Sequence, residues 1–214
     1  MFSNDPAGRP DRIVVGISGA TGVIYGIRML QALRACGVQT HLVLSRAARL
    51  TLAHECDLSV RDVLDLADVH YQPEDVGAAI ASGSFRTRGM VVAPCSVKTL
   101  AQVAAGTCDT LLARACDVTL KERRRLVLMV REVPLTLTHL RNMTTVTENG
   151  GIIAPPVPAF YTRPAGVDDI VDQTVGRVLD LFDLDTGAFP RWGTDAGPVI
   201  RQRSLEWEGS GQPV

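Results

Sequence analysis

The stretch Arg12–Gly26, RIVVGISGATGVIYG, contains the three signals that decide the fold. It begins with a run of β-branched residues, which is typical of a buried parallel strand. A glycine-rich turn follows at 18–22, and the apolar periodicity of residues 23–35 predicts a helix. This order of strand, turn and helix places backbone N–H groups and a helix N-terminus against an anion, usually a phosphate. The stretch therefore predicts either an ordinary turn of an α/β protein or a site for a phosphate-bearing ligand.

The spacing of the glycines separates this turn from dinucleotide-binding turns. Gly16, Gly19 and Gly22 follow the pattern G-x-x-G-x-x-G, whereas dinucleotide sites use G-x-G-x-x-G. The second predicted strand ends in Ser45-Arg46, so no acidic residue stands where a ribose contact is expected. The more specific of the two hypotheses is therefore a site for a phosphate-bearing cofactor other than a dinucleotide, and the other is an ordinary turn.

Composition indicates one soluble globular domain. The chain has 214 residues, 46% hydrophobic and 21% charged, which is enough to bury a full core. The net charge of -1 provides no overall field that would attract nucleic acid or an anionic membrane. No apolar run approaches the roughly 20 residues that span a bilayer. Five cysteines without a C-x-x-C pair predict reduced thiols in the cytoplasm, and four scattered histidines predict no metal site.

Predicted strands and helices alternate along the chain, which indicates a three-layer, Rossmann-like α/β domain with a parallel sheet flanked by helices. The predicted strands are 13–17, 39–44, 90–93, 126–130 and 152–154. The predicted helices are 23–35, 46–53, a short piece after Ser59, 98–105, 109–122, 135–146 and 167–182. Residues 68–88 are expected to be loop-like, and Asp109 is expected to cap its helix. We expect a disordered lead at 1–11, the domain at 12–193 and a tail at 194–214.

Polar residues follow four of the predicted strands. In open α/β sheets the ligand lies beyond the carboxyl ends of the strands. Those ends carry Gly19-Ala20-Thr21, Ser45, Cys95-Ser96 and Arg131-Glu132. Hydroxyl and N–H groups suit the phosphate and ring edges of flavin mononucleotide (FMN), and an arginine suits its phosphate or ring carbonyls. The sequence therefore favours an FMN site, with simple helix caps as the alternative for each Ser or Thr.

A second candidate cluster is cationic. Arg114, Asp117 and Lys121 fall at i, i+3 and i+7 on one predicted helix. One interpretation is a solvated face whose charges pair with one another. The other is a basic pocket for a phosphate group, completed by Arg177 from the last helix and Tyr161 from the proline-rich loop.

Seven segments taken together resemble the UbiX family of flavin prenyltransferases. They are GISGATGVIYG, LSRAA, ASGSFRT, APCSVKTLA, DVTLKERR at 117–124, VREVPL and PAFY. The resemblance covers nearly all of Arg12 to Trp192 and includes Pro190-Arg191-Trp192-Gly193. It implies a metal-independent enzyme that joins the dimethylallyl group of dimethylallyl monophosphate to N5 and C6 of reduced FMN. The prenylated FMN then serves UbiD-type decarboxylases, and the family's dodecamers imply a homo-oligomer.

The resemblance also implies roles for individual positions. Those implied for FMN are Gly19, Ala20, Thr21, Ser45, Ser96, Val97, Lys98, Thr99 and Arg131. Those implied for the prenyl phosphate are Lys121, Tyr161 and Arg177, with Arg114, Ser82 and Ser84, across a subunit boundary. Those implied for catalysis are Glu132, Glu55, Thr21 and Lys121. Thr21 stands where many family members have serine, and it keeps the hydroxyl.

Two other functions compete with this interpretation. A non-catalytic FMN-binding subunit would not require Lys121, Tyr161, Arg177 and Glu132 together, and all four are present. A flavin-dependent decarboxylase that acts directly on its substrate is expected to carry a histidine near the flavin early in the chain. The sequence offers Tyr25 there instead.

Overall fold

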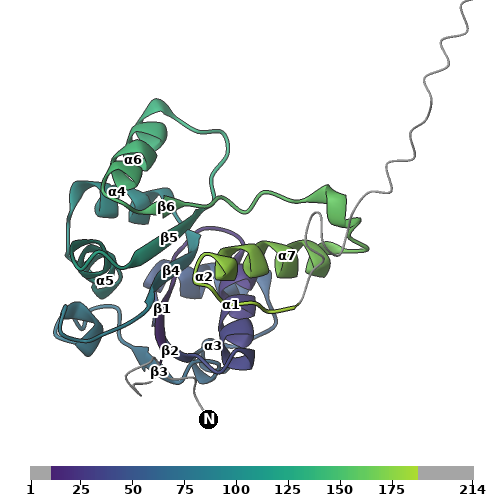
Figure 1. The fold of residues 1–214 in the computed structure, drawn as a ribbon, viewed down its shortest axis with the longest axis horizontal. Coiled ribbons are helices and arrows are strands. Elements are labelled where there is room, and N and C mark those ends of the chain that lie inside the picture. Colours follow the sequence, from purple (N-terminus) through teal and green to yellow (C-terminus); the bar gives the residue numbers. More distant parts are fainter. Residues whose placement is uncertain (1–10, 188–214) are drawn as a thin grey trace, which may run out of the picture.

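The structure, a computed structural model, describes residues 11–187, and Figure 1 shows a twisted sheet between two layers of helices. The predicted tail and the Pro190–Gly193 segment lie outside the described residues. The strands, all parallel, are β1 (Arg12–Ile17), β2 (Gln39–Leu44), β3 (Val69–Tyr71), β4 (Gly89–Cys95), β5 (Arg125–Val130) and β6 (Ile152–Ile153). Their order in the sheet is β3-β2-β1-β4-β5-β6, so the topological switch point lies between β1 and β4. The predicted Rossmann-like fold is confirmed.

Helices cover both faces of the sheet. They are α1 (Val23–Ala35), α2 (Arg46–Glu55), α3 (Val60–Asp65), α4 (Val97–Ala105), α5 (Leu111–Lys121), α6 (Leu137–Glu148) and α7 (Val167–Asp180). Helices α1, α2, α3 and α7 share one buried cluster with Ile13 and Val15, whereas α4, α5 and α6 share the other with Val14. Strand β1 is therefore apolar on both faces, which explains its unbroken β-branched run. No helix within residues 11–187 is long and apolar enough to cross a membrane.

The prediction that residues 68–88 form only a loop is wrong. This region contains the edge strand β3 and a short 3₁₀ helix, η1 (Ala79–Ala81). Strand β3 has only three residues, none of them fully buried, so it leaves no apolar run in the sequence. Strand β4 also continues past its predicted end at Ala93, through Pro94, with an irregular register against β5.

Two helix starts differ from the prediction because a threonine caps each of them. Thr110 caps α5 by accepting a hydrogen bond from the Ala113 N–H at 3.3 Å, whereas the predicted cap, Asp109, accepts one from Gln102. Helix α6 begins at Leu137, two residues later than predicted, because Thr136 is its cap. A threonine in an extended conformation satisfies the first free N–H groups of a helix and so fixes its start.

Candidate functional site

A buried serine joins the two strands at the switch point. The Ser18 hydroxyl, which follows β1, donates to the Pro94 carbonyl at 2.9 Å and accepts from the Ser96 N–H at 2.7 Å. These two bonds fix the carboxyl end of β1 against the end of β4. Sequence reasoning did not single out Ser18, because the partners lie 76 and 78 residues away in the chain.

A cavity of about 320 Å³ lies beyond the carboxyl ends of β1, β2 and β4. Five of the residues predicted for FMN line this switch-point cavity, namely Gly19, Ser45, Ser96, Lys98 and Thr99. Its volume is within the usual range for small-molecule sites. The cavity offers hydroxyl groups, the Lys98 ammonium and the Arg46 guanidinium, which pairs with the Glu74 carboxylate of the same lining at 2.6 Å. Its cations and hydroxyls fit the phosphate and sugar chain of a nucleotide.

The hydroxyls of the switch-point cavity are also helix caps. Ser45 accepts a hydrogen bond from the Ala48 N–H at 3.1 Å and caps α2. Ser96 accepts one from the Thr99 N–H at 3.3 Å and caps α4, and its hydroxyl lies 3.2 Å from that of Thr99. The interpretation of these residues as helix caps is therefore confirmed, and their role in FMN binding stays a prediction. The starts of α2 and α4 meet at one cavity, where their free N–H groups favour a negative charge.

The other four residues predicted for FMN do not line this cavity. Ala20 is buried in the turn after β1 and Thr21 is exposed beside it. Val97 begins α4, while Arg131 is exposed directly after β5. Burial raises the pKa of the Tyr25 phenol on α1, and the positive charge of the nearby Arg131 partly opposes this rise. These four residues therefore follow strands at the same edge of the sheet as the cavity, but outside its lining.

The N–H groups at the start of α1, which were predicted to face a phosphate, are bonded to a carboxylate of the chain itself. Helix α1 begins after Gly22, which has no side chain to cap it. The two carboxylate oxygens of Glu55 accept the Gly22 N–H at 3.1 and 2.9 Å, and one of them accepts the Val23 N–H at 2.9 Å. The residue that the resemblance assigns to catalysis thus also caps α1 from the end of α2.

We predict that Glu55→Gln lowers the free energy of unfolding by about 1 kcal/mol, because the amide carries no charge and keeps a single acceptor oxygen. Thermal melting of the purified variant measures this loss. Asp57→Asn, at an exposed position two residues further on, is the matched control and should melt like the wild type. Equal melting temperatures for Glu55→Gln and the wild type would contradict the capping role.

Glu132 is half-buried where the chain leaves β5. Its Oε1 accepts the hydrogen bond of the neighbouring Val133 N–H at 3.0 Å. The backbone of the preceding residue, Arg131, is held by a 3.0 Å hydrogen bond to the Cys95 carbonyl at the end of β4. A carboxylate positioned in this way stands at the same rim as the switch-point cavity.

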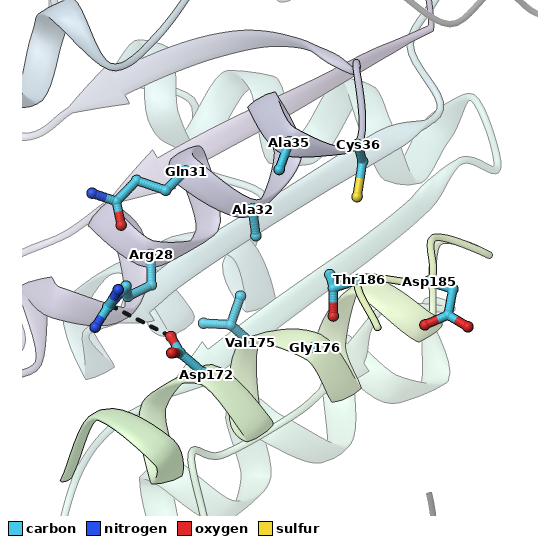
Figure 2. A pocket seen from close by; sticks show the side chains of 10 residues that line it. All are labelled: Arg28, Gln31, Ala32, Ala35, Cys36, Asp172, Val175, Gly176, Asp185 and Thr186. Atoms are coloured by element: carbon cyan, nitrogen blue, oxygen red, sulfur yellow. Dashed lines mark ion pairs between the residues drawn. The ribbon is translucent and has the colours of Figure 1, made fainter. Parts of the chain in front are cut away.

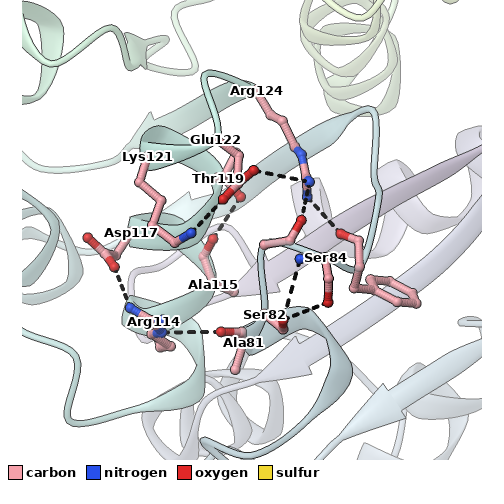
Figure 3. Close-up of polar contacts among 12 residues, drawn as sticks. Ala81, Ser82, Ser84, Arg114, Ala115, Asp117, Thr119, Lys121, Glu122 and Arg124 are labelled. Atoms are coloured by element: carbon pink, nitrogen blue, oxygen red, sulfur yellow. Dashed lines mark hydrogen bonds and ion pairs between the residues drawn. The ribbon is translucent and has the colours of Figure 1, made fainter.

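The second predicted cluster forms beside α5 (Figure 3). Arg114 donates to Asp117 at 2.7 Å and to the Ala81 carbonyl at 3.3 Å. The Ser82 and Ser84 hydroxyls lie 2.9 Å apart on the adjoining loop. On the same side, Lys121 donates to Glu122 at 2.5 Å. The structure therefore brings together the α5 part of the predicted phosphate site, with its cations paired to neighbouring carboxylates.

Tyr161 and Arg177 do not join this cluster within one chain. Tyr161 belongs to the short 3₁₀ helix η2 (Phe160–Thr162), which lies on the arm between β6 and α7 that extends away from the sheet (Figure 1). Arg177 lies on α7, which packs on α1 on the opposite face from α5, and it pairs with Asp180 at 2.6 Å. A single subunit therefore presents the predicted phosphate site in separate parts.

A further cavity of about 320 Å³ lies between α1 and α7 (Figure 2). Arg28 and Asp172 face each other across it as an ion pair of 3.4 Å. None of the predicted site residues lines it. Within residues 11–187, no three His, Cys, Asp or Glu side chains are grouped so that they could hold a metal ion.

Comparison with known proteins first defines the class. The Flavoprotein family matches residues 3–179 of the chain. This class agrees with the parallel sheet and with a cavity at its switch point.

The relatives narrow the class further. A flavin prenyltransferase UbiX from Thauera aromatica is 59% identical over 90% of this chain and 100% of the relative. The crystal structure of AnUbiX (PadA1) in complex with FMN and dimethylallyl pyrophosphate is 54% identical, with a TM-score of 0.85, over 86% of this chain and 98% of that one. A dodecameric FMN-dependent UbiX-like decarboxylase from Escherichia coli O157:H7 is 51% identical, with a TM-score of 0.83, over 85% and 98%. The chain therefore belongs to the UbiX flavin prenyltransferases.

Proposed function

We propose that this protein transfers the dimethylallyl group of dimethylallyl monophosphate to N5 and C6 of reduced FMN, which releases phosphate and closes a fourth ring on the flavin. The observation that carries the proposal is the convergence of Gly19, Ser45, Ser96, Lys98 and Thr99 on one cavity at the switch point. Together with the family, this donor set supports FMN at that place. We place the functional domain at residues 12–193 and the protein in the cytoplasm.

Positive charge beside α5 suits the phosphate of the prenyl donor. As the donor ionises, negative charge grows on the departing phosphate, and preorganised cations stabilise it. Lys121 and Arg114 supply this charge, and the Ser82 and Ser84 hydroxyls supply neutral donors. Their present carboxylate partners, Asp117 and Glu122, keep the cations oriented until the phosphate arrives.

We assign proton transfer to Glu132, with Glu55 and Thr21 close to the same rim. Formation of a bond at C6 requires removal of a proton, and a carboxylate within reach can accept it. Glu132 is half-buried and held at the end of β5 by its contact with Val133, so its position is defined. Glu55 is fixed in turn by the N–H groups at the start of α1.

We further propose that a second subunit completes the donor site with Tyr161 and Arg177. The arm and the loop before α6 expose large apolar side chains, with Phe160, Val157 and Val133 exposed by 71%, 69% and 74%. Large apolar side chains gathered on one exposed segment, as Val157 and Phe160 are on the arm, are typical of a surface that binds a partner. Such an arm, inserted into a neighbouring subunit, would bring its tyrosine to a site that lacks one. One relative is a dodecamer, which agrees with this arrangement.

The shared site can be tested by mixing two inactive variants, Lys121→Met and Arg177→Met. If each site takes Lys121 from one chain and Arg177 from another, co-expression of the two variants mixes their subunits at random. About a quarter of the sites then contain both native residues, so about a quarter of wild-type activity should return. A site contained within one chain would stay inactive in every mixture. Each variant expressed alone is the control, and prenylated flavin measured by chromatography is the readout.

The reaction itself can be tested through its product. After anaerobic incubation with reduced FMN and dimethylallyl monophosphate, the low-molecular-mass fraction should activate a UbiD-type decarboxylase that was produced without its cofactor. Fractions from reactions that lack the donor are the control and should leave that enzyme inactive. An inactive decarboxylase in both cases would refute the proposed function.

A further inference from the structure

We propose that Arg124 is a positioning residue that holds the serine loop, defined as residues 81–85, at a fixed place beside Lys121. This inference rests on the proposed function, because it concerns the site for the donor phosphate. The serine loop carries Ser82 and Ser84, whereas Lys121 ends α5, so the two parts of the site belong to separate segments of the chain. Something must fix their relative position if they are to bind one phosphate together.

The Arg124 guanidinium contacts the serine loop through two hydrogen bonds. Its Nη1 donates to the Phe85 carbonyl at 2.7 Å, and its Nη2 donates to the Gly83 carbonyl at 2.6 Å. Only 16% of its side chain is exposed, so these charge-assisted bonds are partly shielded from water. The rigid fork of a guanidinium can hold two carbonyls at once, which the single ammonium of a lysine cannot do with the same geometry.

The backbone of Arg124 is itself held in place. The Arg124 N–H donates to the Thr119 carbonyl of α5 at 2.9 Å, and the next residue begins β5. At the far end of the serine loop, the ring of Phe85 packs against His41, with the Arg12 guanidinium 4.9 Å from its centre. Arg124 therefore links the loop to the sheet and to α5.

The same side chain reaches Lys121 through Glu122 (Figure 3). Glu122 lies 3.8 Å from the Arg124 guanidinium and 2.5 Å from the Lys121 ammonium, and the bond and charge of Lys121 lower the pKa of the Glu122 carboxyl. The loop backbone lies directly against this pair, since a Cβ on Gly83 would come within 2.1 Å of the Glu122 oxygen and 2.8 Å of the Lys121 nitrogen. Arg124 thus touches both the loop and the carboxylate that orients the lysine.

The consequence is specific to the prenyl donor. The switch-point cavity is lined by the ends of β1, β2 and β4, and Arg124 does not belong to it. Loss of Arg124 should therefore loosen the serine loop and weaken donor binding while FMN binding stays as in the wild type. A small displacement of groups that must act together is enough to reduce binding and rate strongly.

The test compares Arg124→Met, Arg124→Lys and the control Arg125→Met in the full chain loaded with FMN. Arg125 is a neighbouring arginine whose exposed side chain pairs with Asp183 instead of the loop. We expect Arg124→Met to raise the KM for dimethylallyl monophosphate at least about tenfold, with a smaller change in kcat and unchanged FMN affinity. Arg124→Lys should recover part of this loss, and Arg125→Met should behave as the wild type. An equal loss of FMN affinity, or the same KM change in Arg125→Met, would overturn the proposal.

Hydrogen exchange provides a readout that does not depend on turnover. The N–H groups of Ser82 and Phe85 are bonded to the Ala79 and Ser82 carbonyls. Their exchange should accelerate in Arg124→Met and remain at the wild-type rate in Arg125→Met. Unchanged exchange in Arg124→Met would overturn the positioning role even if the wild type proved to make no prenylated flavin. A wild type without transferase activity but with this difference in exchange would refute only the proposed function.

Discussion

Glu132→Gln is expected to lower the rate of prenyl transfer at least about 100-fold, which is the usual contribution of a general acid or base. Glutamine has nearly the same shape and can still accept the Val133 N–H that Glu132 accepts at 3.0 Å. It cannot take up a proton from the flavin carbon. The local fold and FMN affinity should therefore stay close to the wild type while single-turnover formation of prenylated FMN slows.

The matched control for this prediction is Glu148→Gln, the same change at the exposed end of α6. It should leave the rate unchanged. Single-turnover reactions with saturating donor separate the chemical step from product release. A wild-type rate in Glu132→Gln would remove Glu132 from proton transfer and leave Glu55 as the remaining carboxylate assigned to it.

Gly26→Ala is expected to lower the free energy of unfolding by about 3 kcal/mol, which is the upper range for overpacking a core. Gly26 lies where α1 crosses the sheet. A Cβ there would come within 2.4 Å of the Ala93 carbonyl oxygen and 2.6 Å of the Ile17 side chain. The carbonyl belongs to β4 and cannot move without disturbing the sheet, so α1 must shift outward. For a domain of this size, the melting temperature should fall by roughly 6–12 °C.

Gly77→Ala is the control for the stability prediction. This exposed glycine lies in a turn, and a Cβ on it would make only an ordinary contact of 3.6 Å with the Asp75 carboxylate. Its melting temperature should stay near that of the wild type. Denaturant titration measures both variants, and a Gly26→Ala protein as stable as the wild type would show that α1 can move away from β4 at little cost.

The fold could be predicted from local sequence because both faces of its sheet are covered. Strand β1 is buried on both sides, so it appears as a continuous β-branched run, and the amphipathic period of α7 is equally clear. The carboxyl ends of parallel strands meet at one edge, which is why Ser45 and Ser96 could be placed in one site before the structure was known. Strand β3 was not predicted because its three residues, two half-buried and one exposed, are too few to show a period in the sequence.

The parts of the site that the sequence could not reveal depend on contacts distant in the chain. Glu55 caps α1 from 33 residues away, and Ser18 joins two strands across 76 residues. No local pattern encodes either contact. Arg124 stands within a run of charged residues that looks like an ordinary solvated surface, yet its guanidinium holds carbonyls 39 and 41 residues earlier in the chain.

The most direct test of the central claim is the mass of the flavin after reaction. The purified protein is incubated anaerobically with reduced FMN and dimethylallyl monophosphate. The flavin is then extracted, and its mass is measured by mass spectrometry. We predict a gain of one C5 prenyl unit together with release of inorganic phosphate. Unmodified FMN with the donor intact would contradict the account and favour a protein that carries FMN or acts directly as a decarboxylase.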